Sequence, residues 1–282
     1  MKKENVLITG TSSGFGFLTT LTLAKKGYHV IATMRDIKKK TSLLEEAKKN
    51  GVFDSIDIVS LDVTDEKQIQ KVVEYVSTTY GSLDILINNA GYCTGGITET
   101  IPLSSFKEQF DTNFFGVIAV TKAFLPFMRK QRKGKIINIG SVSGSFGFPA
   151  MAPYVSSKFA LRGYSESLRL ELLPFNIFVS LVEPGSYQTN IWEKGLENVQ
   201  LSVESDYQHL VNNVFKEATN AKENGNNPLE VAEKLAFICS VKKPAFYYAI
   251  GKETKRLVGL KKWIPWSLLE KIITYKLTRK KD

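Results

Sequence analysis

The sequence predicts one α/β domain built on a doubly wound parallel sheet. Three observations favour this fold class. Apolar runs of strand length alternate with helical patterns along most of the 282 residues, which is typical of a sheet covered by helices. The runs Ile136–Ile139 and Val179–Val182 are nearly continuous in apolar residues, as expected for strands buried on both faces. A glycine-rich turn directly follows the first strand.

The elements follow one another in a regular order. We expect strands at Asn5–Thr9, Tyr28–Thr33, Ile56–Leu61, Ile85–Asn88, Lys135–Ile139, Ile177–Glu183 and Phe246–Ile250. Helical patterns cover Phe17–Lys26, Lys38–Asn50, Glu66–Tyr80, Ser104–Gln131, Pro153–Leu172 and Pro228–Val241. Gly27 ends the first helix. Gly116 and Pro126 predict that the long fourth helix bends or divides.

The chain divides into a domain, an insertion and a tail. Residues 1–251 are expected to form one domain, and residues 186–227 a loop-rich insertion within it. The extension 252–282 is basic and amphipathic, with ten Lys or Arg against three acidic residues.

Composition excludes several classes of function. Only two cysteines and two histidines occur, without a C-x-x-C pair, so neither a zinc site nor a disulfide framework is expected. Cysteine usage favours a reducing compartment, here the cytoplasm. The apolar runs are too short for a signal peptide or a membrane span. The net charge of +10 indicates anionic partners, which include a nucleotide cofactor, nucleic acid and lipid head groups.

The turn after the first strand is a candidate phosphate-binding loop. Its residues are Gly10, Ser12, Ser13, Gly14, Phe15 and Gly16. Glycines let the backbone turn tightly and let a pyrophosphate approach the start of the next helix. The spacing G-x-x-x-G-x-G differs from the usual G-x-G-x-x-G fingerprint. An ordinary glycine-rich connection is the alternative, and the position between the first strand and a helix favours nucleotide binding.

The stretch Ser141–Lys158 combines a hydroxyl, a phenol and an ammonium. Tyr154 and Lys158 are four residues apart in a helical pattern, so they share one face. A positive charge about 4 Å from a phenol favours the phenolate by about 4 kcal/mol at an effective dielectric near 20, and burial opposes this. We therefore expect Tyr154 to act as a general acid or base near pH 7. Taken alone, the pair is more often an aromatic core residue beside a surface lysine.

These motifs together resemble the classical short-chain dehydrogenase/reductase family. The matching segments are Thr9–Gly16, Asn88–Gly91, Asn113, Ser141, Tyr154–Lys158 and Pro184–Thr189, in the family's order. The resemblance spans Val6 to Gly251 and implies a Rossmann-type fold. The sequence TMRD after the second strand and the long tail look most like the hydroxysteroid and retinol dehydrogenase branch.

The resemblance implies roles for individual residues. Tyr154 would exchange a proton with a carbonyl oxygen that Ser141 also binds. Lys158 would tune the phenol and hold the nicotinamide ribose, and Asn113 would hold a water that relays protons. A buried Asn113 that only satisfies backbone groups is the alternative.

Further positions would contact the cofactor. They are Asn89, Ala90 and Gly91 at the ribose, Asp62 and Val63 at the adenine, and Thr189 with the backbone of Pro184, Gly185 and Tyr187 at the carboxamide. A helix cap is the competing use of Asp62. Tyr187 and Phe15 depart from the residues that the family usually has at these positions.

The end of the second strand bears on cofactor choice. NAD sites place a carboxylate there, whereas NADP sites place an Arg beside the 2′-phosphate. Met34 occupies the carboxylate position and Arg35 follows it, so the sequence favours NADP(H). Asp36 is expected to cap the following helix instead.

Apolar residues are interspersed among polar ones in both the insertion and the tail. In the insertion, Tyr187 and Trp192 are candidate substrate contacts, and packing of the loop on the core is the alternative. In the tail, Trp and aliphatic residues alternate with basic ones, as in a helix lying on an anionic membrane. A cover for the sheet edge or a contact in a homo-oligomer would use the same residues. Nucleic-acid binding is not expected, because no recognition motif accompanies the charge.

The sequence therefore predicts an NADP(H)-dependent oxidoreductase. Its substrate would be a hydrophobic carbonyl compound or alcohol that is steroid-like, retinoid-like or of medium chain length. Two alternatives remain open. One is a 3-oxoacyl-carrier-protein reductase, which would explain the basic surface but not the amphipathic tail. The other is a nucleotide-sensing protein without turnover, although Ser141, Tyr154 and Lys158 are all retained.

Overall fold

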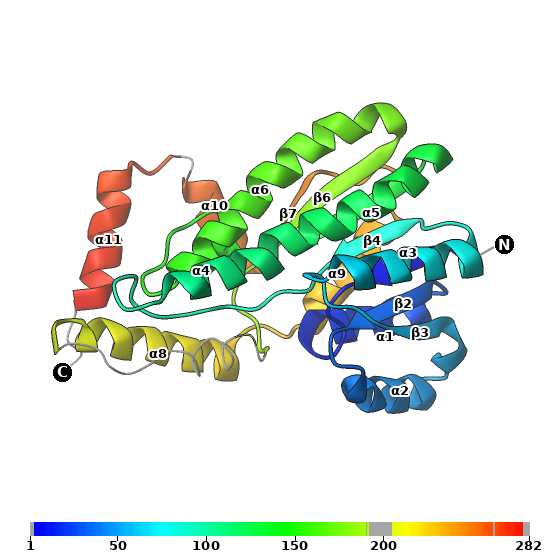
Figure 1. Ribbon diagram of the computed structural model, residues 1–282. Helices are drawn as coiled ribbons and strands as arrows, with labels where there is room; N and C mark the ends of the chain where they lie inside the picture. The colour runs from blue at the N-terminus through cyan, green and yellow to red at the C-terminus, as the bar shows by residue number, and fades with distance from the viewer. Residues whose placement is uncertain (1–2, 190, 192–204, 262, 279–282) are drawn as a thin grey trace.

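A seven-stranded parallel sheet forms the centre of the protein (Figure 1). The computed structural model describes residues 3–189, 191, 205–261 and 263–278. The strand order is β3-β2-β1-β4-β5-β6-β7. The strands are β1 (Asn5–Ile8), β2 (His29–Met34), β3 (Ile56–Ser60), β4 (Ile85–Asn88), β5 (Gly134–Ile139), β6 (Ile177–Pro184) and β7 (Tyr247–Ile250). The predicted doubly wound parallel sheet is confirmed.

Helices cover both faces of the sheet because each strand buries side chains on both sides. Val6 and Ile8 of β1 pack in one apolar cluster, whereas Leu7 between them packs in the other. The first cluster includes side chains of α1 (Gly14–Lys25), α2 (Lys40–Lys49) and α9 (Leu229–Ser240). The second includes side chains of α3 (Glu66–Tyr80), α5 (Gly116–Gln131) and α6 (Ala152–Leu172).

The predicted long helix is divided, and the break precedes Gly116. Helix α4 (Leu103–Phe110) passes through a π-helical turn, Asp111–Phe115, into α5. Pro126 lies inside α5 without ending it. The side chain of Val63 packs against Gly116, where a Cβ atom would come within 2.7 Å of Val63 Cγ2. The π-helical turn also contains Asn113, one of the predicted site residues.

The C-terminal third differs most from the prediction. The segment expected to be loop-rich contains a long helix, α8 (Gln208–Asn224). The tail forms two helices, α10 (Lys252–Lys261) and α11 (Trp266–Thr278). Helix α10 contacts the edge strand β7, and α11 contacts α8 (Figure 1). Among the described helices, none is both long and apolar enough to span a bilayer.

Candidate active site

A large cavity opens at the carboxyl ends of the central strands. Its volume is about 1990 Å³. The strand order reverses between β1 and β4, and ligands of open α/β sheets bind at such a switch point. The turn after β1, the segments after β2 to β6, and parts of α8, α10 and α11 line the cavity. The cavity therefore combines most of the predicted site residues with segments that the sequence did not connect to them.

The glycine turn packs closely on the segment that follows β4. Gly10 has a φ of 71°, and a Cβ atom there would lie 2.8 Å from the Cα atom of Ala90. A Cβ atom at Gly16 would lie 2.5 Å from the side-chain nitrogen of Asn89. Helix α1 begins at Gly14, and Ser13 caps it without a side-chain hydrogen bond. Because the first N–H groups of a helix attract anions, this cradle fits the pyrophosphate of a dinucleotide.

Asn89 connects this cradle to the next strand. Its side-chain amide donates to the carbonyl oxygens of Thr9 and Gly10 at 2.9 and 2.8 Å. The Thr9 hydroxyl in turn accepts from the backbone N–H groups of Asn89 and Ala90. Side chains at these positions therefore fix the turn, and Gly91 continues the same wall of the cavity.

Cationic side chains line the cavity at the end of β2. Met34 is buried with 1% of its surface exposed, whereas Arg35 and Lys39 line the cavity. Asp36 also lines it, and its carboxylate accepts a hydrogen bond from the Lys38 N–H, so the predicted cap is confirmed. Lys39 was not among the predicted site residues; its position in the run Lys38–Lys40 was the available signal.

Asp62 and Val63 line the cavity after β3. The Asp62 carboxylate accepts from the backbone N–H and the hydroxyl of Thr64, at 3.0 and 2.7 Å. The cap of α3 is Asp65, which accepts from the N–H groups of Lys67 and Gln68. Capping α3 is therefore not the role of Asp62.

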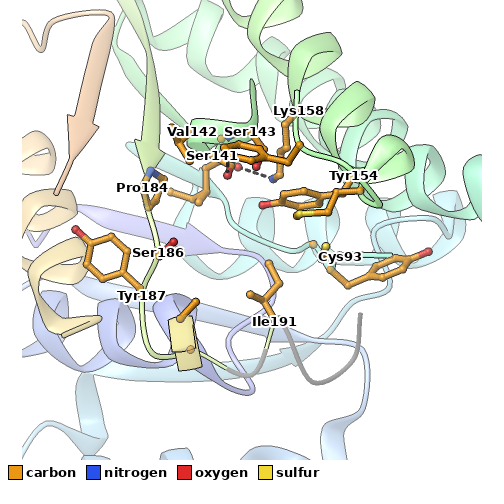
Figure 2. Close-up of a pocket in the computed structure, with 18 of the residues that line it drawn as sticks. Cys93, Ser141, Val142, Ser143, Tyr154, Lys158, Pro184, Ser186, Tyr187 and Ile191 are labelled. Atoms are coloured by element: carbon orange, nitrogen blue, oxygen red, sulfur yellow. Dashed lines mark hydrogen bonds between the residues drawn. The ribbon is translucent and has the colours of Figure 1, made fainter. Parts of the chain in front are cut away.

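Ser141, Tyr154 and Lys158 come together at the inner end of the cavity (Figure 2). Ser141 follows β5, and its Oγ accepts a hydrogen bond of 3.1 Å from the Ser143 N–H. Tyr154 and Lys158 project from the first two turns of α6, and both are buried. Lys158 Nζ lies 5.7 Å from the centroid of the Tyr154 ring and donates to the carbonyl oxygen of Ile139 at 2.8 Å.

Burial controls the pKa values of this group. It raises the pKa of the Tyr154 phenol, and hydrogen bonding with Ser141 opposes the increase only in part. It lowers the pKa of Lys158 from 10.5 to about 8. Both side chains are shifted toward their neutral forms because desolvation outweighs their favourable contacts. Burial therefore opposes the effect on the phenol that was expected of Lys158, and it shifts Tyr154 away from the phenolate form.

Asn113 lies behind this group, 1% exposed. Its amide donates to the Tyr92 carbonyl oxygen at 3.0 Å, and its Oδ1 accepts from the Tyr92 N–H at 3.1 Å. A Cβ atom at Gly91 would lie 3.1 Å from this Oδ1 and 3.9 Å from Lys158 Nζ. The side chain of Asn113 thus holds the backbone of Tyr92 beside Lys158, which is the structural alternative considered above.

The loop after β6 is placed differently from the expectation for its side chains. Pro184 and Gly185 line the cavity, and the Thr189 methyl carbon would be 4.0 Å from a Cβ atom at Gly14. The ring of Tyr187 points away from Ser141 and Tyr154 (Figure 2). It is 2% exposed, lies 5.6 Å from Phe15 in an edge contact, and its hydroxyl donates to Glu230 at 2.8 Å.

Tyr187 nevertheless lines the cavity, so its contact with substrate stays a prediction. Phe15 likewise packs on the core while lining the cavity. Trp192, the other candidate substrate contact, lies outside the described residues.

Cys93 in the cavity wall and Glu183 beside the site were not among the predicted residues. Cys93 packs with Met151 and Tyr154, and burial raises its thiol pKa to about 12. Glu183 is fully buried at the end of β6 and accepts from Ser145 and Tyr247 at 2.9 and 2.8 Å. An acidic residue inside an apolar strand was a signal for Glu183, whereas the sequence carried none for Cys93. No cluster of potential metal ligands occurs among the described residues.

The sequence is similar to those of known proteins. The short chain dehydrogenase family matches residues 4–200. An uncharacterized oxidoreductase of Bacillus subtilis, YusZ, is 45% identical, with 98% of this chain and 99% of the relative covered. A 3-ketodihydrosphingosine reductase of Bacteroides thetaiotaomicron is 35% identical, with 96% of each covered. Human retinol dehydrogenase 8 is 38% identical, with 86% of this chain and 79% of the relative covered.

Solved structures share the fold. A short-chain dehydrogenase from Streptomyces avermitilis superimposes with a TM-score of 0.80 at 27% identity, covering 98% of this chain and 97% of its own. ElxO with bound NADP superimposes with a TM-score of 0.75 at 27% identity, covering 90% of this chain and all of its own. With the glycine cradle and the Ser141–Tyr154–Lys158 group in place, the chain belongs to the short-chain dehydrogenase/reductase family, whose members are nicotinamide-dependent oxidoreductases, and within it resembles the hydroxysteroid and retinol dehydrogenases.

Proposed function

We propose that this protein interconverts the carbonyl and alcohol forms of an elongated hydrophobic substrate, using NADP(H). The observation that carries the proposal is the placement of Ser141 and Tyr154 between two unlike parts of one cavity. On one side lies the glycine cradle with its cationic rim. On the other lie apolar side chains from several segments, among them Phe146, Phe148, Met151, Ile191, Val214 and Leu257.

Ser141 and Tyr154 supply the polar groups that a carbonyl oxygen needs. Ser141 Oγ accepts a hydrogen bond from the Ser143 N–H, and its hydroxyl can also donate one to the substrate oxygen. The Tyr154 phenol is neutral, so it can donate its proton as negative charge develops on the oxygen. When bound, the nicotinamide supplies or accepts the hydride. Lys158, anchored to Ile139, presents its remaining N–H groups to the ribose.

The preference for NADP(H) rests on charge at the end of β2. Arg35 and Lys39 line the cavity there, and buried Met34 offers no acceptor for a ribose hydroxyl. A guanidinium forms paired hydrogen bonds with a phosphate, which only NADP(H) carries at the 2′ position. Asp36 is the competing carboxylate, and its hydrogen bond to Lys38 is what supports its role as a cap.

The test is a screen of hydrophobic ketones, aldehydes and alcohols with the reduced and oxidised forms of both cofactors. Turnover of apolar carbonyl compounds with NADPH, abolished in Tyr154→Phe, is the expected result. Preference for 3-oxoacyl thioesters would favour the carrier-protein reductase alternative. Cofactor binding without any turnover would favour a nucleotide sensor. Equal kcat/KM with NADH and NADPH would contradict the cofactor assignment.

The outer face of the tail supports a peripheral contact with an anionic membrane. Trp263 is 86% exposed and Trp266 64% exposed, with the exposed Leu260 and Leu268 beside them in the sequence. Basic residues outnumber acidic ones in this segment, so charge and apolar side chains both suit a lipid surface. We propose that the enzyme is located in the cytoplasm and meets lipid-like substrates at the membrane surface. Self-association of the protein would be the competing use of this exposed surface.

Vesicle sedimentation tests the membrane contact. The full chain should bind vesicles rich in phosphatidylserine at low salt and be released as the Debye length falls from about 30 to about 8 Å. The double variant Trp263→Ser and Trp266→Ser should bind more weakly. Equal sedimentation of the wild type and the double variant would contradict the membrane contact. A homo-oligomer that stays in the supernatant in the presence of vesicles would contradict it as well.

A further inference from the structure

The C-terminal helices form part of the inner cavity wall. Leu257 of α10 and Leu269, Ile273 and Tyr275 of α11 line the same cavity as Ser141 and Tyr154. Helix α10 also packs on the loop after β6. Thr254 is 4% exposed, and its hydroxyl occupies the space that a Cβ atom at Gly185 would need. The tail is therefore built into the site in addition to exposing aromatic residues outward.

Lys261, the last residue of α10, fastens this helix to the catalytic side of the cavity. Its Nζ lies 4.9 Å from the centroid of the Phe146 ring and 5.3 Å from that of Phe159. The same ammonium donates a hydrogen bond to the carbonyl oxygen of Ser145. A cation between two aromatic rings and a carbonyl oxygen is held more firmly than a solvated surface lysine.

Ser145 is also held from the opposite side. Its hydroxyl donates to the fully buried carboxylate of Glu183 at 2.9 Å and accepts from Arg162. Arg162 NH1 is 3.5 Å from the other Glu183 oxygen, and Tyr247 donates to Glu183 at 2.8 Å. One carboxylate oxygen thus accepts two hydroxyl hydrogen bonds, whereas the oxygen beside Arg162 accepts none among the described residues, and burial raises the pKa of Glu183.

The Ser145 segment is continuous with the catalytic group. Ser141 lies four residues before Ser145 and begins the short helix Val142–Gly144. A Cβ atom at Gly144 would lie 2.9 Å from the Lys158 carbonyl oxygen and 3.1 Å from Glu183. Lys261 therefore holds the tail on a turn that packs against both Ser141 and Lys158.

We propose that Lys261 is a positioning residue that fastens α10, and that the cavity wall formed by α10 and α11 determines specificity for long apolar substrates. This inference rests on the proposed function. A short ketone needs only the pocket at Ser141 and Tyr154. A long-chain ketone extends along Leu257, Leu269 and Ile273, so its binding depends on the position of the tail. Releasing Lys261 removes that wall while leaving Ser141, Tyr154 and Lys158 in place.

The experiment compares Lys261→Met with Lys261→Arg and with Lys255→Met, which removes an exposed lysine from the same helix. Each full-length variant is assayed with NADPH on methyl ketones of increasing chain length. For Lys261→Met we expect KM for the longest ketone to rise roughly tenfold, the change that a partly buried cation–π contact supports. KM for the shortest ketone and kcat for both should change less than about threefold. Lys261→Arg should restore the KM, because a guanidinium also stacks on aromatic rings.

Hydrogen exchange of the backbone amides in 252–261, without substrate, gives a second measure that does not depend on turnover. Lys261→Met should exchange faster there than the wild type, and Lys255→Met should not. Equal exchange in the two methionine variants would overturn the role of Lys261. Faster exchange with an equal rise in KM at every chain length would overturn the specificity role. If the wild type turns over no carbonyl compound, the proposed function fails, and the exchange result still decides whether Lys261 fastens α10.

Discussion

The titration of Lys158 gives the sharpest test of how the site is built. Burial lowers its pKa from 10.5 to about 8. Each tenfold change in proton affinity corresponds to about 1.4 kcal/mol, so the folded protein disfavours the ammonium by about 3 kcal/mol relative to the unfolded chain. Between pH 8 and 10.5 the unfolded chain binds more protons at this position than the folded one. The unfolding free energy contributed by Lys158 therefore rises with pH across this window.

Replacing Lys158 with methionine removes this titration at similar side-chain length. The unfolding free energy of the wild type, minus that of Lys158→Met, should increase by about 3 kcal/mol between pH 8 and 10.5. Urea denaturation at half-unit pH steps measures it, and subtracting the variant cancels groups that titrate in both proteins. Lys107→Met, at an exposed position of α4, controls for the loss of a lysine. A difference that stays flat, or that falls as the pH rises, would refute the buried-ammonium reasoning.

Three further changes test the other parts of the site. Tyr154→Phe should keep cofactor affinity within about twofold and abolish turnover, because only the dissociable proton is lost; activity within a few-fold of the wild type would contradict the proton-donor role. Arg35→Ala should weaken NADPH binding by roughly ten- to a hundredfold and barely affect NADH, since a charge-assisted hydrogen bond contributes about 1.5–3 kcal/mol; calorimetric titration of both cofactors checks this, and equal losses would refute it. Gly16→Ala should lower the unfolding free energy by about 1–3 kcal/mol, because its methyl group would meet the Asn89 amide and the Gly10 backbone. Gly163→Ala in α6 is the matched control, since a Cβ atom there meets nothing within 4 Å and alanine favours a helix by up to about 1 kcal/mol; thermal or urea unfolding that places both variants equally would refute the steric argument.

Local sequence signals determined the sheet and the polar centre of the site. The period of apolar residues placed α3 and β4 at their observed bounds, Glu66–Tyr80 and Ile85–Asn88. The glycine turn and the four-residue spacing of Tyr154 and Lys158 are likewise local, so the turn before α1 and the face of α6 that carries both side chains could be predicted from the chain. These features depend on neighbouring residues, and neighbouring residues are what a sequence shows directly.

Helix α8 was not predicted, because the residues of Gln208–Asn224 are mostly polar. This helix packs against α11, which lies in the distant tail. Helices of this kind are stabilised more by tertiary contacts than by intrinsic propensity. Tyr187 was expected at the substrate, yet Phe15 and Glu230 hold its ring and hydroxyl in the core.

Only the tertiary structure decided the pKa directions and the place of the tail. The spacing of Tyr154 and Lys158 predicted attraction between phenolate and ammonium, whereas the depth at which both are buried makes desolvation the larger effect. In the sequence, nothing distinguishes Lys261 from the other basic residues of the tail. Its partners Ser145, Phe146 and Phe159 lie more than a hundred residues earlier, and folding alone brings them together. Burial and long-range contact depend on the whole chain at once, so local patterns cannot supply them.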